Sequence, residues 1–180
     1  MCRNSDYDPD VICLFLRYNK NMKITLLAVG KIKEPFYRDA VGEYAKRLSR
    51  FCELAVTEVA DEPAPERASA AERKNIIARE GERLLAASSP RAFRIALAID
   101  GKRRSSEAFA ADLDRLALSG KSSIEFFIGG SLGLSDAVLQ AADLKLSFSD
   151  MTFPHQLMRV ILLEQVYRAF KINRNETYHK

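Results

Sequence analysis

The chain has 180 residues, of which 47% are hydrophobic and 29% are charged. That apolar fraction excludes an intrinsically disordered chain and fits one globular domain with its own core. The 8 Gly and 6 Pro exclude collagen-like and low-complexity proteins, and no apolar run approaches the ~20 residues that cross a bilayer. The cysteines Cys2, Cys13 and Cys52 have no metal-ligand spacing. We therefore expect no disulfide framework, no metal site, no membrane association and a cytoplasmic protein.

The formal net charge is only +4, but the polar residues are unevenly distributed. Both histidines of the chain, His155 and His179, lie in its last 26 residues. The same stretch carries more basic than acidic side chains: Arg159, Arg168, Lys171, Arg174 and Lys180 against Glu164 and Glu176. We expect polar chemistry to be concentrated at this end of the chain.

Residues 1–21 differ from the rest. Three aspartates precede a short apolar run at 11–16, an order that does not fit a signal peptide. After Met22, a sequence typical of a β-strand begins. We expect residues 1–21 to be a disordered extension and residues 22–180 to be one domain. An added edge strand over 11–18 remains an alternative.

From Met22 onward, β-rich runs alternate with helical spacing. In chain order, the pattern predicts a strand over 23–29, a helix over 35–51, a strand over 54–59, a helix over 69–85, a strand over 94–99, a helix over 105–116, a strand over 123–128, a helix over 135–142, a strand over 144–148 and a helix over 154–172. Strands separated by helices pair in parallel, with helices on both faces of the sheet. The predicted fold class is therefore α/β, open and doubly wound.

Ligands of open α/β sheets bind beyond the carboxyl ends of the strands. Three of the predicted strand ends have unusual sequences, at 97–101, 129–133 and 147–154. Because they follow the third, fourth and fifth strands, they would line one rim of the sheet. The middle one contains Gly129, Gly130 and Gly133, which favours either a ligand loop or a tight turn. It matches neither the dinucleotide fingerprint nor the phosphate-binding P-loop.

The predicted last helix is apolar around most of its circumference, which indicates burial on all sides. We interpret the second apolar face as the interface of a homodimer. A central core helix of a monomer is the alternative.

Several polar side chains near this helix have both a functional and a plain interpretation. His155 begins the helix and Arg159 follows one turn later. Further on, Arg168, Lys171 and Arg174 form a basic strip that either binds phosphate or is simply solvated. Tyr178 and His179 end the chain, where an aromatic side chain among basic ones can stack on a base or fray.

The chain from Met22 to Lys180 resembles the RlmH (YbeA-like) family of SPOUT methyltransferases. The resemblance rests on the stretches 22–24 with 28–31, 129–134, 146–155, Arg159 with 164–169, and 178–180. It implies a C-terminal trefoil knot, which generic topology rules would exclude. It also implies a homodimer that uses S-adenosylmethionine to methylate N3 of a pseudouridine in 23S ribosomal RNA on the assembled ribosome.

Motif by motif, the resemblance places the cofactor at the three strand ends named above. The implied cofactor-binding residues are Leu97, Gly129, Gly130, Phe148, Ser149, Asp150, Met151, Thr152 and Phe153. His155 would remove the N3 proton, Arg159 or Arg168 would stabilise an anion or bind phosphate, and Tyr178 and His179 would reach the partner's pocket. Arg168, Lys171 and Arg174 would bind RNA.

Two other classes of protein remain open. One is a noncatalytic ribosome-binding factor that retains the methyltransferase fold. The other is a flavodoxin-like or nucleotide-binding oxidoreductase, against which the missing fingerprint and the basic C-terminus argue.

Overall fold

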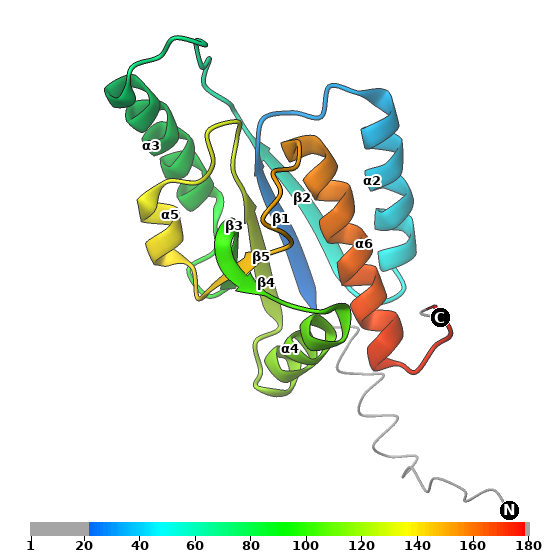
Figure 1. Cartoon of the computed structure of the whole chain (residues 1–180). Coiled ribbons are helices and arrows are strands. Elements are labelled where there is room, and N and C mark those ends of the chain that lie inside the picture. Colours follow the sequence, from blue (N-terminus) through cyan, green and yellow to red (C-terminus); the bar gives the residue numbers. More distant parts are fainter. Residues whose placement is uncertain (1–21, 179–180) are drawn as a thin grey trace, which may run out of the picture.

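In the computed structural model, which describes residues 22–178, five parallel strands form one sheet in the order β2-β1-β4-β3-β5 (Figure 1). The strands are β1 (Lys23–Val29), β2 (Glu53–Val59), β3 (Phe93–Arg103), β4 (Ser123–Ile128) and β5 (Leu144–Ser147). The parallel pairing confirms the predicted sheet. The expectations for residues 1–21, an extension or an edge strand, lie outside the described residues.

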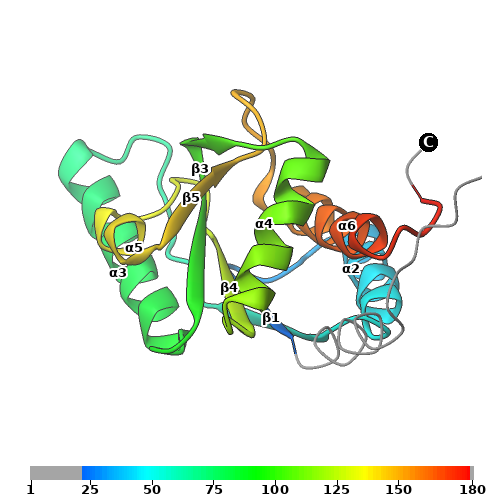
Figure 2. The ribbon, with the colours of Figure 1, turned by 90° about the horizontal axis from the view of Figure 1, so that it is seen from below.

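Five helices of the described residues cover the two faces of this sheet. They are α2 (Pro35–Leu48), α3 (Ala70–Ala87), α4 (Ser106–Leu118), α5 (Asp136–Ala141) and α6 (His155–Asn173). Helices α3 and α5 lie on one face, and α2, α4 and α6 lie on the other (Figures 1 and 2). The main core lies under α2, α4 and α6, and a smaller one lies under α3 and α5. The predicted alternation and the helices on both faces are thus confirmed.

Local signals account for the helix starts. The Ser69 and Glu72 side chains form a capping box at α3, and the Ser105 side chain caps α4. Helix α2 ends at Leu48, earlier than predicted, because the Leu48 carbonyl accepts hydrogen bonds from the backbone N–H groups of Phe51 and Cys52. This turn directs the chain into β2.

The third strand is longer than predicted because its register shifts. Leu97 and Lys102 both pair with Leu146, so residues 98–101 are looped out between them. A Cβ atom on Gly101 would lie 2.7 Å from the backbone of Leu146, which explains glycine at this close approach. The sequence predicted a strand that ends at residue 99, whereas the chain rejoins β5 and continues to Arg103.

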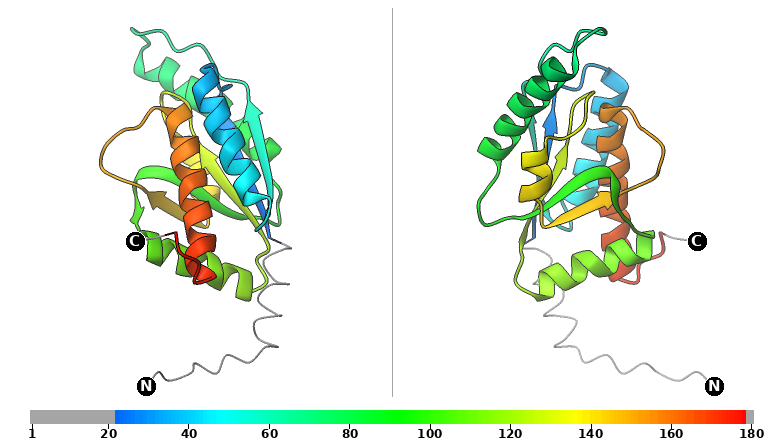
Figure 3. Two further views of the ribbon diagram at one scale, coloured as in Figure 1. Left: turned by 90° about the vertical axis from the view of Figure 1, so that its right-hand side faces the viewer. Right: turned by 60° about the vertical axis from the view of Figure 1, so that its left-hand side comes forward.

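Helix α6 lies beside both α2 and α4 on its face of the sheet (Figure 3). These neighbours account for most of its apolar circumference, with Leu162, Leu163 and Val166 fully buried. Leu157 and Ile161, one turn apart, are only half-buried. No helix within residues 22–178 is long and apolar enough to cross a membrane.

The central position of α6 generates a prediction for stability. Leu162→Ala should lower the free energy of unfolding by about 2–5 kcal/mol, because it leaves a cavity where Leu162 is 0% exposed. Leu118→Ala, at a side chain that is 61% exposed, is the matched control and should change little. Urea unfolding at one fixed protein concentration measures both, and equal losses would contradict the placement of α6.

Candidate functional site

The three predicted loops meet in one cleft at the carboxyl ends of β3, β4 and β5. The cleft has a volume of about 730 Å³, within the range of small-molecule sites. Its lining comes from residues 97–99 after the regular part of β3, 128–134 after β4, and the segment from β5 into α6. The expectation that these ends share one rim is confirmed.

The glycine loop, residues 129–133, folds back on itself. Gly130 and Gly133 form an isolated bridge, in which the Gly133 N–H donates to the Gly130 carbonyl at 3.2 Å. A Cβ atom on Gly129 would lie 2.4 Å from the Gly133 carbonyl oxygen, and Gly133 has φ of +89°. The loop is therefore a tight turn and a wall of the cleft at once, so the two sequence interpretations are compatible.

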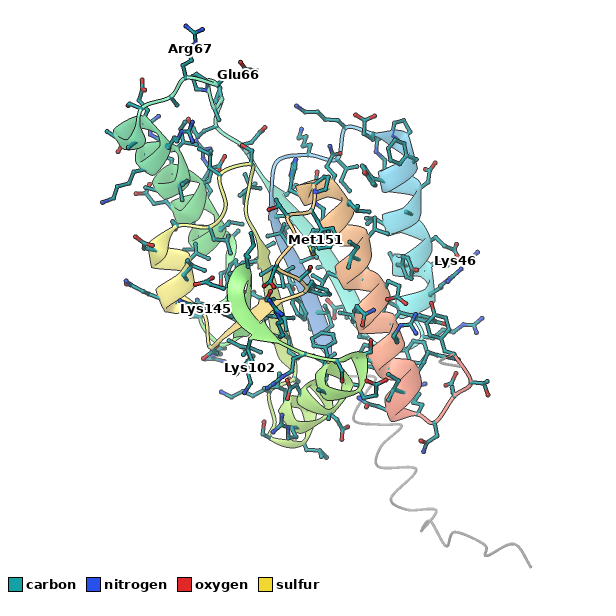
Figure 4. All side chains as sticks on the ribbon, in the orientation of Figure 1. Lys46, Glu66, Arg67, Lys102, Lys145 and Met151 are labelled. Carbon is teal, nitrogen blue, oxygen red and sulfur yellow. The ribbon has the colours of Figure 1, made fainter. Side chains whose placement is uncertain are left out.

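Most of the residues expected to bind a cofactor line this cleft. They are Leu97, Gly129, Gly130, Phe148, Ser149, Met151, Thr152 and Phe153. Within the last loop, the Ser147 hydroxyl donates to the Ser149 carbonyl, and the Met151 N–H donates to the Ser149 hydroxyl. These bonds shape the loop, whose Met151 side chain is 72% exposed (Figure 4).

Asp150 does not fit that expectation. It is absent from the cleft lining, and its carboxylate instead forms an exposed ion pair with Arg103, which belongs to the extended end of β3. The looped-out segment of β3 brings Arg103 beside β5, so only the tertiary pairing reveals this contact.

His155, the first residue of α6, lines the cleft. Its Nδ1 atom is buried without a hydrogen-bond partner. Burial and the nearby Arg159 guanidinium lower the pKa of His155 below its usual 6.5, although a hydrogen bond to the Val29 backbone and the Asp61 carboxylate partly oppose this. The imidazole is therefore neutral near pH 7 and able to accept a proton.

Arg159 lies one turn after His155 but does not line the cleft. Its side chain is fully buried, and Nη2 donates to the carbonyls of Val29 (2.9 Å) and Gly30 (2.7 Å). Its Nη1 atom donates to Glu58 Oε1 at 2.6 Å. These acceptors take up both terminal nitrogens, and the remaining Nε atom is buried without a partner, so the suggested role on a reacting anion does not suit this side chain. Arg159 instead joins α6 to the ends of β1 and β2.

The predicted basic strip is not a row of unpaired cations. Arg168 pairs with Glu164 at 2.6 Å and lies over the Tyr178 ring. Lys171 pairs with Glu176. The Arg174 guanidinium lies 4.4 Å from the centre of the Phe51 ring. Binding to phosphate would require Arg168 and Lys171 to exchange partners.

Tyr178 lies away from the cleft of its own chain. Its ring packs edge-on against Tyr167 at 5.0 Å, and its hydroxyl is 3.5 Å from Glu164 Oε1. At a rise of 1.5 Å per residue, Tyr167 lies about 18 Å along α6 from His155. Tyr178 and His155 are therefore not brought together within one chain. His179 lies outside the described residues.

Sequence reasoning missed two features of the site. Met158 lines the cleft from the first turn of α6, and Glu80 lies buried next to the glycine loop. A signal for Glu80 was present in the sequence. It follows Ile77 by three residues and precedes Leu84 by four, so an acid lies on the apolar stripe of α3.

Within residues 22–178, no group of three or more His, Cys, Asp or Glu side chains is arranged to hold a metal ion. Cys52 is buried, which raises the pKa of its thiol to about 12. This thiol is therefore not a ready nucleophile.

Arg159→Met should lower the free energy of unfolding by about 2–4 kcal/mol, because two buried carbonyls lose their side-chain hydrogen-bond donor. Glu58 lies at an exposed position and keeps its hydrogen bond from the Ile32 N–H. Arg91→Met, at an exposed side chain, is the control and should change stability by less than about 0.5 kcal/mol. Denaturant unfolding measures both, and an unaffected Arg159→Met would contradict the structural role.

Comparisons with known proteins agree with this architecture. A family model described as "Predicted SPOUT methyltransferase" matches residues 22–179. The "Ribosomal RNA large subunit methyltransferase H" of Bifidobacterium adolescentis is 59% identical over 159 residues, covering 88% of this chain and 100% of that protein. Its counterpart from Clostridium acetobutylicum is 56% identical with the same coverage. A solved probable methyltransferase from Bordetella pertussis shares the fold, with a TM-score of 0.51, 13% identity and coverage of 86% of this chain and 99% of that one. The chain therefore belongs to the RlmH family of SPOUT methyltransferases, a membership that implies the C-terminal trefoil knot.

Proposed function

We propose that this chain uses S-adenosylmethionine to methylate N3 of a pseudouridine in 23S ribosomal RNA within the assembled ribosome. The observation that carries the proposal is the cleft of about 730 Å³, in which three strand-end loops meet beside His155. Residues 22–180 would carry the activity as one domain in the cytoplasm. The names of the curated relatives support ribosomal RNA of the large subunit as the substrate.

The cleft fits S-adenosylmethionine in size and in chemistry. Apolar side chains from Leu97, Ile99 and Met158 offer a surface for a flat base, and Gly129 and Gly130 allow a ligand to approach the backbone. The loop from Phe148 to Phe153 closes the remaining side. When bound, the cofactor supplies a methyl group activated by a positively charged sulfur.

Within this site, His155 is the group suited to removing the N3 proton. Its pKa is lowered mainly by burial, so the neutral base is available near pH 7. His155 would accept the N3 proton and leave an electron pair on N3 for the methyl group that the bound cofactor would supply, with the sulfur keeping the electron pair of its former bond to that group. The cleft walls contribute by holding the two reactants in line. Arg159 acts indirectly, as a positioning residue for the first turns of α6.

The proposed RNA-facing residues are Arg168, Lys171 and Arg174. The ion pair with Glu164 and the contact with the Tyr178 ring orient the Arg168 guanidinium. A phosphate can replace a carboxylate as the partner of a guanidinium. Lys171 and Arg174 extend the same positive region along the end of α6. Each exchange would release counterions and make binding depend on salt.

A homodimer would complete the site. Leu157 and Ile161 remain half-buried on α6, and Phe36 at the start of α2 is 60% exposed. These apolar side chains of neighbouring helices favour self-association. Because Tyr178 lies far from its own cleft, it and His179 would act on the target base only at the cleft of the partner subunit.

The first test is transfer of a labelled methyl group from S-adenosylmethionine to three acceptors taken from cells that lack this protein: whole ribosomes, isolated subunits and naked 23S RNA. We expect label only with assembled ribosomes, mapped to N3 of a pseudouridine. Ribosome binding without label on any acceptor would instead favour the noncatalytic ribosome-binding factor. Absence of S-adenosylmethionine binding would reject the proposed cofactor.

His155→Ala should lower the rate of methyl transfer at pH 7 by about 100-fold or more, since general bases contribute about 10²–10⁴-fold. The wild-type rate should fall only as the pH drops below the lowered pKa of His155, and the variant should lose that acid limb. Single-turnover rates between about pH 5 and 8 test this. Calorimetry with S-adenosylmethionine is the control for cofactor binding, and an unchanged rate would remove His155 as the base.

The shared site predicts complementation between two inactive chains. One carries His155→Ala, and the other ends at Thr177 and so lacks Tyr178 and His179. Co-expressed chains that pair at random should regain about a quarter of the wild-type activity, because half the dimers contain one intact combination of cleft and tail. Lack of recovery in a mixture shown to contain heterodimers would contradict the proposed exchange.

A further inference from the structure

Glu80 on α3 is a buried acid that the proposed chemistry does not use. Its side chain belongs to a residue that is 4% exposed. One carboxylate oxygen, Oε1, accepts a hydrogen bond from the backbone N–H of Glu62 at 3.0 Å. The other, Oε2, is buried and has no hydrogen-bond partner. One carboxylate oxygen is therefore uncompensated inside the protein.

The charges around Glu80 do not neutralise it. The Arg83 guanidinium donates to the Ala60 carbonyl at 2.9 Å and pairs with Glu62. Arg79 also pairs with Glu62, at 3.6 Å. Within residues 22–178, no basic side chain forms an ion pair with Glu80. Burial, together with nearby Asp61 and Glu62, raises the pKa of Glu80 above its usual range, although the Glu62 N–H and Arg83 lower it.

Glu80 and its neighbour Gly81 meet both ends of the segment that contains the glycine loop. A Cβ atom on Gly130 would lie 2.9 Å from Glu80 Oε2, and a Cβ atom on Gly81 would lie 2.0 Å from the Ser135 hydroxyl oxygen. Gly130 itself lines the cleft. The unpartnered oxygen thus rests against the backbone that forms the cleft wall.

A buried carboxylate without a cation is destabilising, and an apolar side chain of similar shape would cost less. A positive charge that binds nearby offsets this destabilisation, and the offset is larger where the dielectric constant is low. In the proposed reaction, the methyl donor carries a positive charge at sulfur, and its product, S-adenosylhomocysteine, carries an uncharged thioether. The two ligands are otherwise alike.

We infer that Glu80, acting through Gly130, is a positioning residue whose carboxylate makes the cleft prefer the positively charged methyl donor to the demethylated product. This inference rests on the proposed use of S-adenosylmethionine. The preference would favour release of the product after each turnover. It assigns to α3 a role in ligand choice in addition to support of the glycine loop.

The test compares Glu80→Gln with the wild type by calorimetric titration with S-adenosylmethionine and with S-adenosylhomocysteine, at about pH 8 and low salt. Glutamine keeps the shape and the acceptor for the Glu62 N–H, removes the charge, and places an amide NH2 group where Oε2 lies. Affinity for the methyl donor should fall on the order of tenfold, as expected for unit charges roughly 10 Å apart at an effective dielectric constant of about 20. Affinity for the product should change by less than about twofold.

Glu82→Gln, which removes the same charge from an exposed position two residues further along α3, is the matched control and should alter neither affinity. Glu80→Asp retains the charge and should keep most of the preference. Thermal unfolding without ligand checks the fold, and Glu80→Gln should be at least as stable as the wild type at pH 8. The reason is that folding raises the pKa of Glu80. Such a carboxyl destabilises the folded protein as the pH rises above its unfolded pKa, and the effect is complete above its folded pKa.

Equal weakening of both ligands by Glu80→Gln would overturn the inference and leave Glu80 a packing residue. Unchanged affinities for both would also overturn it. Loss of the fold in Glu80→Gln, with the preference also lost in a folded Glu80→Asp, would do the same. By contrast, a wild-type protein that binds neither ligand would refute the proposed cofactor itself, so the two failures are distinguishable.

Discussion

The buried Arg159 guanidinium is the interaction on which the site depends. It links the second turn of α6 to the last carbonyls of β1 and to Glu58 of β2. Burial of a guanidinium is costly. The carboxylate and two carbonyls compensate its Nη1 and Nη2 donors, while the buried Nε atom has no hydrogen-bond partner. His155 lies one turn earlier, so the link fixes where the imidazole stands and also lowers its pKa. Arg159 thus contributes to both the position and the protonation of the proposed base, although burial is the larger cause of the lowered pKa.

The cleft lies where elements from both helical layers meet the carboxyl ends of the strands. From one face of the sheet, α6 contributes His155 and Met158. From the other, α3 supports the glycine loop through Glu80 and Gly81. The glycine loop contributes backbone to the wall between them, since a side chain on Gly129 would meet the Gly133 carbonyl, and Gly133 has a φ of +89°. A backbone wall suits a ligand recognised by shape, and the charges behind it tune which ligand binds.

The same arrangement explains why one chain is an incomplete enzyme in our proposal. Helix α6 has its cleft end at His155 and its tail end near Tyr178, and its length holds the two apart. Apposition of α2 and α6 with a second copy would bring the tail of one chain to the cleft of the other. With no separate RNA-binding domain in residues 22–178, much of the recognition surface would then come from the preassembled ribosome.

The sequence by itself determined the order and type of the elements. The alternation of strand and helix periods and the Ser69–Glu72 capping sequence are local signals, and the structure shows the elements that they indicate. Since parallel strands direct their carboxyl ends to one edge, the sequence also predicted which loops would meet. The resemblance added the family, which the comparisons confirmed.

Contacts between residues distant in sequence were decided only by the tertiary structure. Pairing of β3 with β5 set the length of β3 and drew Asp150 toward Arg103, away from the cleft. Burial at the ends of β1 and β2 turned Arg159 from a suggested anion ligand into a structural cation. Glu80 lies on an apolar stripe of α3, and only the tertiary structure places its carboxylate against Gly130. The physical reason is common to all three, because the partners of a charge depend on burial and distance, which local sequence does not encode.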